Sequence, residues 1–156
     1  MFRPRLVLGL VLALANATVG FAKEPSVAIV VHPGVEVSNL SMNQLRRIFL
    51  ADQQFWPDRS RITLLVRAPG AAERELVLDQ IYQMDESQFR RYWIAKIFRA
   101  EVPSGPKIVW SSNMALELIT AVPGSITFIP AADIDAHVKV VSIDGLLPDQ
   151  PGYPLR

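Results

Sequence analysis

A strand-to-helix turn in the middle of the chain constrains the fold most strongly. Residues 62–66 read Ile-Thr-Leu-Leu-Val, a short apolar run that is typical of a buried strand. The segment 67–74 that follows contains Pro69 and Gly70, which favour a turn. Apolar residues then recur at helical spacing, at Leu76, Val77, Ile81 and Met84. A strand followed directly by a helix is the unit from which α/β sheets are built.

The same turn has the chemistry of an anion site. The first amide N–H groups of a helix lack intrahelical partners, and the aligned peptide dipoles add partial positive charge there. Arg67 at the strand tip and Arg74 in the first helical turn add guanidinium donors that suit phosphate or carboxylate. The alternative is that Gly70 supplies only the turn, Glu73 complements the helix dipole, and the arginines are solvated.

Other segments repeat the alternation of strands and helices. Further apolar runs predict strands over residues 27–31, 108–110, 125–129 and 138–143. Ser41 is expected to cap a helix, and the polar residues 84–87 indicate a break between two helices. The pattern predicts a three-layer α/β sandwich with a mostly parallel sheet, and an antiparallel edge strand is compatible with it.

Two helices in the second half of the chain have defined faces. Phe89, Trp93 and Ile97 share one side of a helix, and we expect this aromatic stripe to lie in the core. Ser111 or Ser112 is expected to cap the next helix, which Pro123-Gly124 ends.

The first 22 residues have the pattern of an export signal. Arg3 and Arg5 precede an apolar stretch over residues 6–15, and Gly20-Phe21-Ala22 offers small residues at the cleavage position. We expect cleavage after Ala22, with Ala17 as the alternative, and a periplasmic product. An uncleaved anchor is disfavoured because the apolar stretch is shorter than the roughly 20 residues that span a bilayer.

The composition and motifs of the chain exclude or disfavour several classes of function. Removing residues 1–22 takes Arg3 and Arg5 from the 16 Lys and Arg, which leaves 14 against 15 Asp and Glu and disfavours nucleic acid as a partner. The chain has no cysteine, which excludes disulfides and thiolate metal sites. No catalytic triad, nucleotide-binding glycine loop or metal motif is present in the sequence, so we expect neither an enzyme nor a cofactor.

The length suits one domain. We expect a signal peptide over residues 1–22, an α/β domain over 23–146 and an extended tail over 147–156. No second apolar run is long enough to cross a membrane after the signal is removed.

Three stretches, taken together, resemble a known family. They are residues 40–50 with the Trp56-Pro57-Asp58 turn, residues 62–74, and residues 121–129, which contain Pro-Gly-Ser-Ile-Thr-Phe-Ile. The combination resembles the periplasmic phosphate-binding proteins that serve ABC transporters. The resemblance implies a single lobe of a type II periplasmic-binding-protein fold, with phosphate or a related oxyanion as ligand. The implied anion cradle consists of Arg67, Gly70, Ala71 and Ala72, with Arg74 assisting.

The chain departs from that family at the ligand loop. The family has an acidic residue and then Ser-Gly-Thr, whereas this chain has Pro69 and then Ala71-Ala72-Glu73. The hydroxyl donors are therefore absent, and Glu73 places negative charge beside the ligand position. The length also leaves no room for a second lobe that closes on the ligand. We therefore expect weak or absent phosphate binding by the isolated domain.

The alternative function is a periplasmic protein–protein interaction module with a decayed ligand site. In this case Trp56 and the helix that carries Arg90 and Arg91 would dock a membrane or envelope protein, although paired arginines are also typical of a solvated face. A homodimer in which two lobes form one composite site would combine both functions, and the sequence leaves this open.

Overall fold

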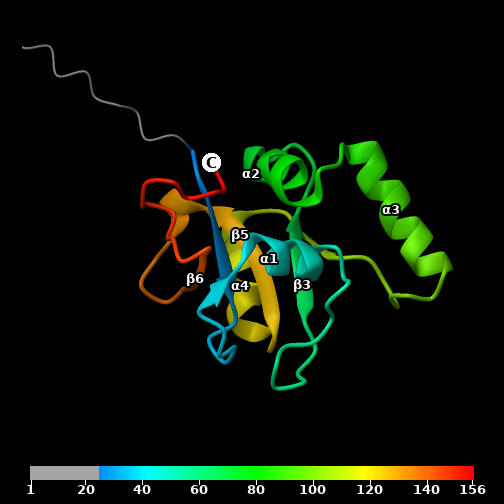
Figure 1. Cartoon of the computed structure of the whole chain (residues 1–156), viewed down its shortest axis with the longest axis horizontal. Coiled ribbons are helices and arrows are strands. Elements are labelled where there is room, and N and C mark those ends of the chain that lie inside the picture. Colours follow the sequence, from blue (N-terminus) through cyan, green and yellow to red (C-terminus); the bar gives the residue numbers. More distant parts are fainter. Residues whose placement is uncertain (1–24) are drawn as a thin grey trace, which may run out of the picture.

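One six-stranded sheet organises the part of the chain that the structure describes. The structure is a computed structural model, and it describes residues 25–156, so the expected export signal lies outside the described residues. The strand order is β2-β6-β1-β5-β3-β4 (Figure 1). The strands are β1 (Val27–Val31), β2 (Asn39–Leu40), β3 (Thr63–Arg67), β4 (Lys107–Val109), β5 (Ser125–Pro130) and β6 (Lys139–Ile143).

The expected mostly parallel sheet is confirmed, but the antiparallel strand lies at its centre and not at an edge. β1 runs antiparallel to both of its neighbours, β5 and β6, whereas the other neighbouring strands pair in parallel. The central position of β1 follows from burial, since all five residues of Val27–Val31 are buried. A strand without a polar face needs cover on both faces and partners on both edges.

Three of the helices, α1, α3 and α4, begin after residues whose side chains cap them. They are α1 (Met42–Phe49), α2 (Ala72–Val77), the π-helical turn η1 (Leu78–Tyr82), α3 (Glu86–Phe98), α4 (Ser112–Ala121) and the short 3₁₀ turn η2 (Ala131–Asp133). The predicted Ser41 cap and the predicted break at residues 84–87 are both confirmed, because Ser41 and Asp85 each form a capping box. Ser111, not Ser112, caps α4.

The helices cover the sheet on both faces, which confirms the three-layer arrangement. On one face, Ile29 and Val31 of β1 belong to a core cluster with residues of α1, α2 and η1. On the other face, Ala28 and Val30 share a second cluster with Ala115 and Ile119 of α4. Alternate residues of β1 therefore fill two separate cores, as the period of a strand requires.

Helix α3 extends away from this sandwich (Figure 1). Phe89 and Trp93 are buried as expected, but Ile97 is 42% exposed, so the expectation of a fully buried stripe was wrong at its last residue. Ile97 is exposed because it lies in the last turn of α3, beyond the part of the helix that packs against the domain. The end of α3 thus presents apolar side chains to solvent.

The C-terminal segment is anchored to the core. Residues 147–156 form turns without a helix or strand, yet Tyr153 and Leu155 are buried. The Val27 amide donates to the Leu155 carbonyl at 3.0 Å, and the Tyr153 hydroxyl donates to the Val27 carbonyl at 2.8 Å. The segment is therefore part of the packed domain and not a free arm. Within residues 25–156 no helix combines the length and the apolar character needed to cross a membrane.

A buried tryptophan joins two of the stretches that carry the family resemblance. Trp56 is buried, and its Nε1–H donates to the Gly124 carbonyl at 2.9 Å. Gly124 has φ +72°, and a Cβ built on it would lie 2.3 Å from the Arg61 carbonyl oxygen. Only glycine fits this close backbone approach.

We predict that Gly124→Ala lowers the free energy of unfolding by about 3 kcal/mol, because positive φ and a backbone clash add together. Gly70→Ala is the matched control, since Gly70 also has positive φ but its Cβ would meet nothing within 4 Å. We expect the control to cost about 1 kcal/mol. Urea denaturation of both variants measures the difference, and equal losses would contradict the clash.

Candidate functional site

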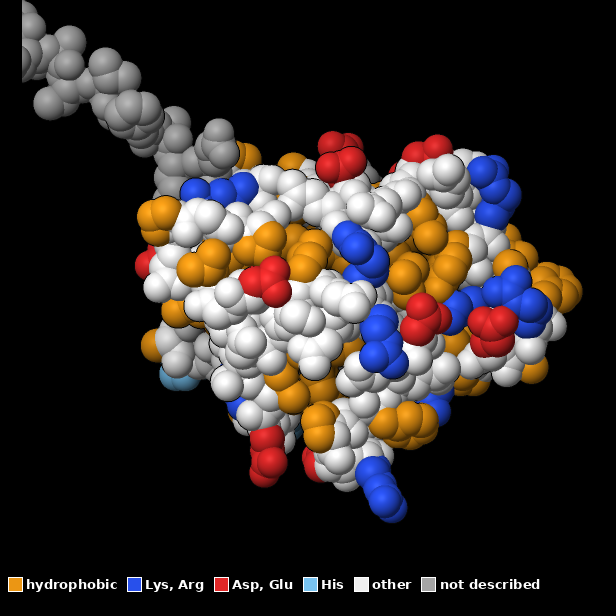
Figure 2. Space-filling view, in the orientation of Figure 1, with side chains coloured by type: hydrophobic (Ala, Val, Ile, Leu, Met, Phe, Trp, Pro, Cys, Tyr) orange, Lys and Arg blue, Asp and Glu red, His pale blue; other side chains and the backbone are white. Residues whose placement is uncertain are grey.

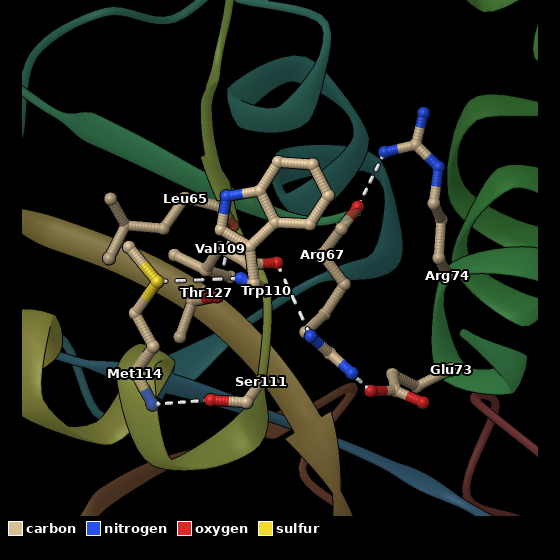
Figure 3. Close-up of polar contacts among 9 residues, drawn as sticks. All are labelled: Leu65, Arg67, Glu73, Arg74, Val109, Trp110, Ser111, Met114 and Thr127. Carbon is tan, nitrogen blue, oxygen red and sulfur yellow. Dashed lines mark hydrogen bonds and ion pairs between the residues drawn. The ribbon is translucent and has the colours of Figure 1, made fainter. Parts of the chain in front are cut away.

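Two parallel strands end side by side at one edge of the sheet. Arg67 at the end of β3 is in register with Val109 at the end of β4. Helix α2 follows β3 and helix α4 follows β4, so both helices begin at this edge (Figure 3). Ligands of α/β sheets bind at the carboxyl ends of the strands, which makes this edge the candidate site.

An internal ion pair engages Arg67. Its Nε donates to Glu73 Oε1 at 2.6 Å, and its Nη1 donates to the Val109 carbonyl at 3.3 Å (Figure 3). The side chains of Arg67 and Glu73 are only 13% and 10% exposed. A charge-assisted bond of this length is a strong interaction, and partial burial reduces its screening by solvent. The Glu73 carboxylate thus occupies the acceptor position that an external anion would take on Arg67.

Arg74 is a structural residue in this arrangement. It is 2% exposed, and its Nε and Nη2 donate to the two carboxylate oxygens of Glu86 at 2.6 and 2.8 Å. Its Nη1 donates to the Arg67 carbonyl at 2.6 Å, and its guanidinium lies 4.7 Å from the ring centroid of Phe89. Because all three guanidinium nitrogens donate to protein oxygens, Arg74 is not placed to assist an anion cradle.

The turn between β3 and α2 presents mainly backbone groups. Gly70 has φ +93°, which supports its predicted role in the turn. Ala71 is the N-cap of α2 and makes no side-chain capping bond, and Ala72 is exposed. Any anion held at Gly70, Ala71 and Ala72 would therefore meet amide groups without hydroxyl support.

Residues after β4 also reach this edge, and the sequence pattern did not single them out for the site. The Ser111 hydroxyl accepts from the Met114 amide at 3.0 Å, and the Trp110 amide donates to Met114 Sδ at 3.4 Å (Figure 3). Ser111 therefore caps α4, while the Trp110 side chain is 73% exposed. The position of Trp110 directly after the end of a strand could have indicated that it lies at this edge.

The structure separates the residues expected to form a partner surface. Arg90 and Arg91 are exposed on α3. Trp56, in contrast, is buried and bonded to Gly124, so its side chain is not part of a docking surface. The aromatic group exposed beside the strand ends is Trp110 instead. Residues 25–156 contain no group of three or more His, Asp or Glu side chains arranged to hold a metal ion.

The sheet order, its central antiparallel strand and the helices on both faces define a periplasmic-binding-protein-like α/β fold. Solved structures that superpose on it include proteins named for phosphate binding or phosphate transport. A Clostridium perfringens protein solved with bound phosphate superposes with a TM-score of 0.65 at 17% identity, over 80% of this chain and 47% of that one. An ABC-type phosphate transport receptor from Vibrio cholerae gives 0.64 at 18% identity, over 80% and 49%.

A third neighbour, PstS from Borrelia burgdorferi, gives a TM-score of 0.65 at 13% identity, over 84% of this chain and 54% of that one. The chain thus spans about half the length of the solved structures that it matches. At these identities the likeness establishes the fold. No protein-family model and no curated protein sequence matches the chain.

The Arg74–Glu86 pair makes a prediction about acid stability. The hydrogen bonds from Arg74 hold the pKa of Glu86 below its usual value of 4.5. A carboxylate whose pKa is lowered by folding stabilises the native state above its unfolded pKa, and this stability is lost as the pH falls through the folded pKa. We expect Glu86→Gln to cost about 1 kcal/mol at neutral pH, limited by solvent screening, and to reduce the acid dependence of stability.

Denaturation midpoints measured from pH 7 down to pH 3 test this expectation. Glu75→Gln is the matched control, because Glu75 is exposed and forms no ion pair among the described residues. If both variants follow the wild-type pH dependence, the ion pair does not contribute to acid stability.

Proposed function

We propose that this chain is a single-lobe domain of the solute-binding type that binds phosphate or a related oxyanion weakly at the turn between β3 and α2. One observation carries the proposal: the guanidinium of Arg67 already holds a carboxylate, that of Glu73, at the carboxyl edge of the sheet. The edge thus has an anion-binding group, and a side chain of the same domain competes for it.

Energetics favour weak binding. Micromolar affinity needs about −8 kcal/mol, and each charged hydrogen bond contributes roughly 1.5–3 kcal/mol. An incoming oxyanion would gain Arg67 and a few backbone amides but would first have to displace Glu73. The phosphate-binding names of the structural neighbours support the ligand class, although those proteins are about twice as long as this chain. The export pattern of residues 1–22 supports a periplasmic location.

A second candidate function, docking of another protein, is favoured by the distribution of exposed apolar side chains. Figure 2 shows hydrophobic and basic side chains together over the α3 side of the domain. Phe98 is 86% exposed and Trp110 73% exposed. The exposed large hydrophobic side chains between residues 94 and 110 are Ile94, Ile97, Phe98, Ile108 and Trp110. Ile94, Ile108 and Trp110 line the same pocket, and apolar groups gathered in this way are typical of interaction surfaces.

Removing the internal competitor tests the oxyanion function. We predict that Glu73→Ala increases phosphate affinity at least about tenfold, because Arg67 then lacks its carboxylate partner and the position beside it is open. Calorimetric titration with phosphate and then sulfate at low salt measures the change. Wild type is expected to bind with a dissociation constant weaker than about 1 mM.

Two controls separate a specific site from a general charge effect. Glu75→Ala removes one negative charge from the same helix without touching Arg67 and is expected to leave phosphate affinity unchanged. The double variant Arg67→Ala with Glu73→Ala should lose the gain. The oxyanion function would be refuted if folded Glu73→Ala gave no saturable heat, or if the double variant bound as well as the single one.

A further inference from the structure

A groove lies between α3 and the edge strand β4. Its cavity volume is about 380 Å³, a size that suits side chains of a bound ligand or peptide. The walls are largely apolar and are formed by Phe89, Trp93 and Ile94 of α3 and by Pro106, Ile108 and Trp110 on the other side. The groove is separate from the Arg67–Glu73 pair, since neither of those residues lines it.

The strand that borders this groove has a free backbone edge. Within residues 25–156, β4 pairs with β3 alone. The Val109 carbonyl accepts from the Ala68 amide at 2.9 Å, so Val109 directs its backbone groups toward β3. Successive residues of a strand direct these groups to opposite sides, and the N–H and C=O of Ile108 therefore point away from β3. An extended segment can add to such an edge.

The rim of the groove is positively charged. Arg90 lines it, whereas Lys107, next to Ile108 in the edge strand, directs its side chain to the opposite face of β4 and lines a neighbouring pocket. Both are exposed, and neither forms an ion pair among the described residues. Glu86 also lines the groove, but both of its carboxylate oxygens accept from Arg74. The available charge at the rim is therefore that of Arg90, and a second cation without an ion pair among the described residues, Lys107, lies on the other face of the same edge strand.

We propose that this groove binds an extended acidic segment of a partner protein, which adds as a strand to β4. The backbone of the segment would pair with Ile108, and its apolar side chains would enter the space between Trp93 and Trp110. Its carboxylates would meet Arg90 at the rim and Lys107 on the other face of β4. The inference rests on the docking role proposed above and is independent of the oxyanion site.

The charge argues against a second copy of this chain as the occupant. A two-fold contact places the same surface on both partners, so Arg90 and Lys107 of one copy would face a rim of the same sign. A membrane surface also fits less well. The most exposed apolar side chain, Phe98, does not line the groove, and a flat bilayer has no strand to pair with Ile108.

The test uses the purified protein and two short end-capped peptides, one alternating valine with aspartate and one alternating valine with lysine. Trp110 is the exposed member of three tryptophans, because Trp56 and Trp93 are buried, so its emission reports occupation of the groove. We expect the acidic peptide to cause a saturable blue shift and the basic peptide to bind at least about tenfold more weakly.

Variants assign the binding to the groove. Arg90→Glu should weaken binding of the acidic peptide about tenfold, whereas Phe98→Ser should leave its affinity unchanged. Ile108→Pro removes an outward N–H without removing a bond to β3 and should abolish binding, with circular dichroism to check folding. If Ile108→Pro does not fold, the loss of affinity in Arg90→Glu is sufficient to test the proposal.

Three results would overturn the proposal. The first is equal or absent binding of the two peptides, in which case Pro106 and Lys107 merely protect a short edge from pairing. The second is a dimer in sedimentation that Arg90→Glu alters and the acidic peptide does not compete with. The third is binding to phosphatidylglycerol vesicles that Phe98→Ser abolishes while neither peptide binds. None of these results changes the phosphate titration of Glu73→Ala, so the two proposals fail separately.

Discussion

The buried guanidinium of Arg74 fixes the geometry on which the candidate site and the groove both depend. It holds the Arg67 carbonyl at the end of β3, the Glu86 carboxylate at the start of α3 and the face of the Phe89 ring. A charge that is 2% exposed needs such partners, because desolvation is costly without them. Arg74 thus helps to hold α3 beside β3, together with the bonds from Tyr92 to the Leu50 carbonyl and from Lys96 to Asp52.

Glu73 neutralises the charge of Arg67 within the domain. Arg67 and Glu73 are both largely buried and balance each other at 2.6 Å. This pairing stabilises the domain, and an external anion would have to replace Glu73 to reach Arg67. The absence of hydroxyl donors at Ala71 and Ala72 acts in the same direction.

Local sequence signals predicted the parts of the fold that depend on neighbouring residues. The capping residues Ser41 and Asp85, the turn at Gly70 and the apolar runs of the strands all lie where the chain pattern places them. Contacts between residues far apart in the sequence could not be predicted in this way. Nothing local shows that β1 runs antiparallel in the centre, that Trp56 is buried against Gly124, or that Arg74 is enclosed by α3. The pairing of both arginines at the turn also depended on tertiary contacts, because Glu73 engages Arg67 and Glu86 engages Arg74.

The central position of β1 also determines when folding can be completed. The first strand of the domain pairs with β5 and β6, and Val27 meets Pro130, about a hundred residues later in the chain. A strand that is apolar on both faces therefore has neither neighbour until nearly the whole sequence is available. Pairing at such separation slows folding and leaves an aggregation-prone apolar segment exposed until the later strands are available. The chain is thus expected to depend on protection of residues 27–31 before its last strand arrives.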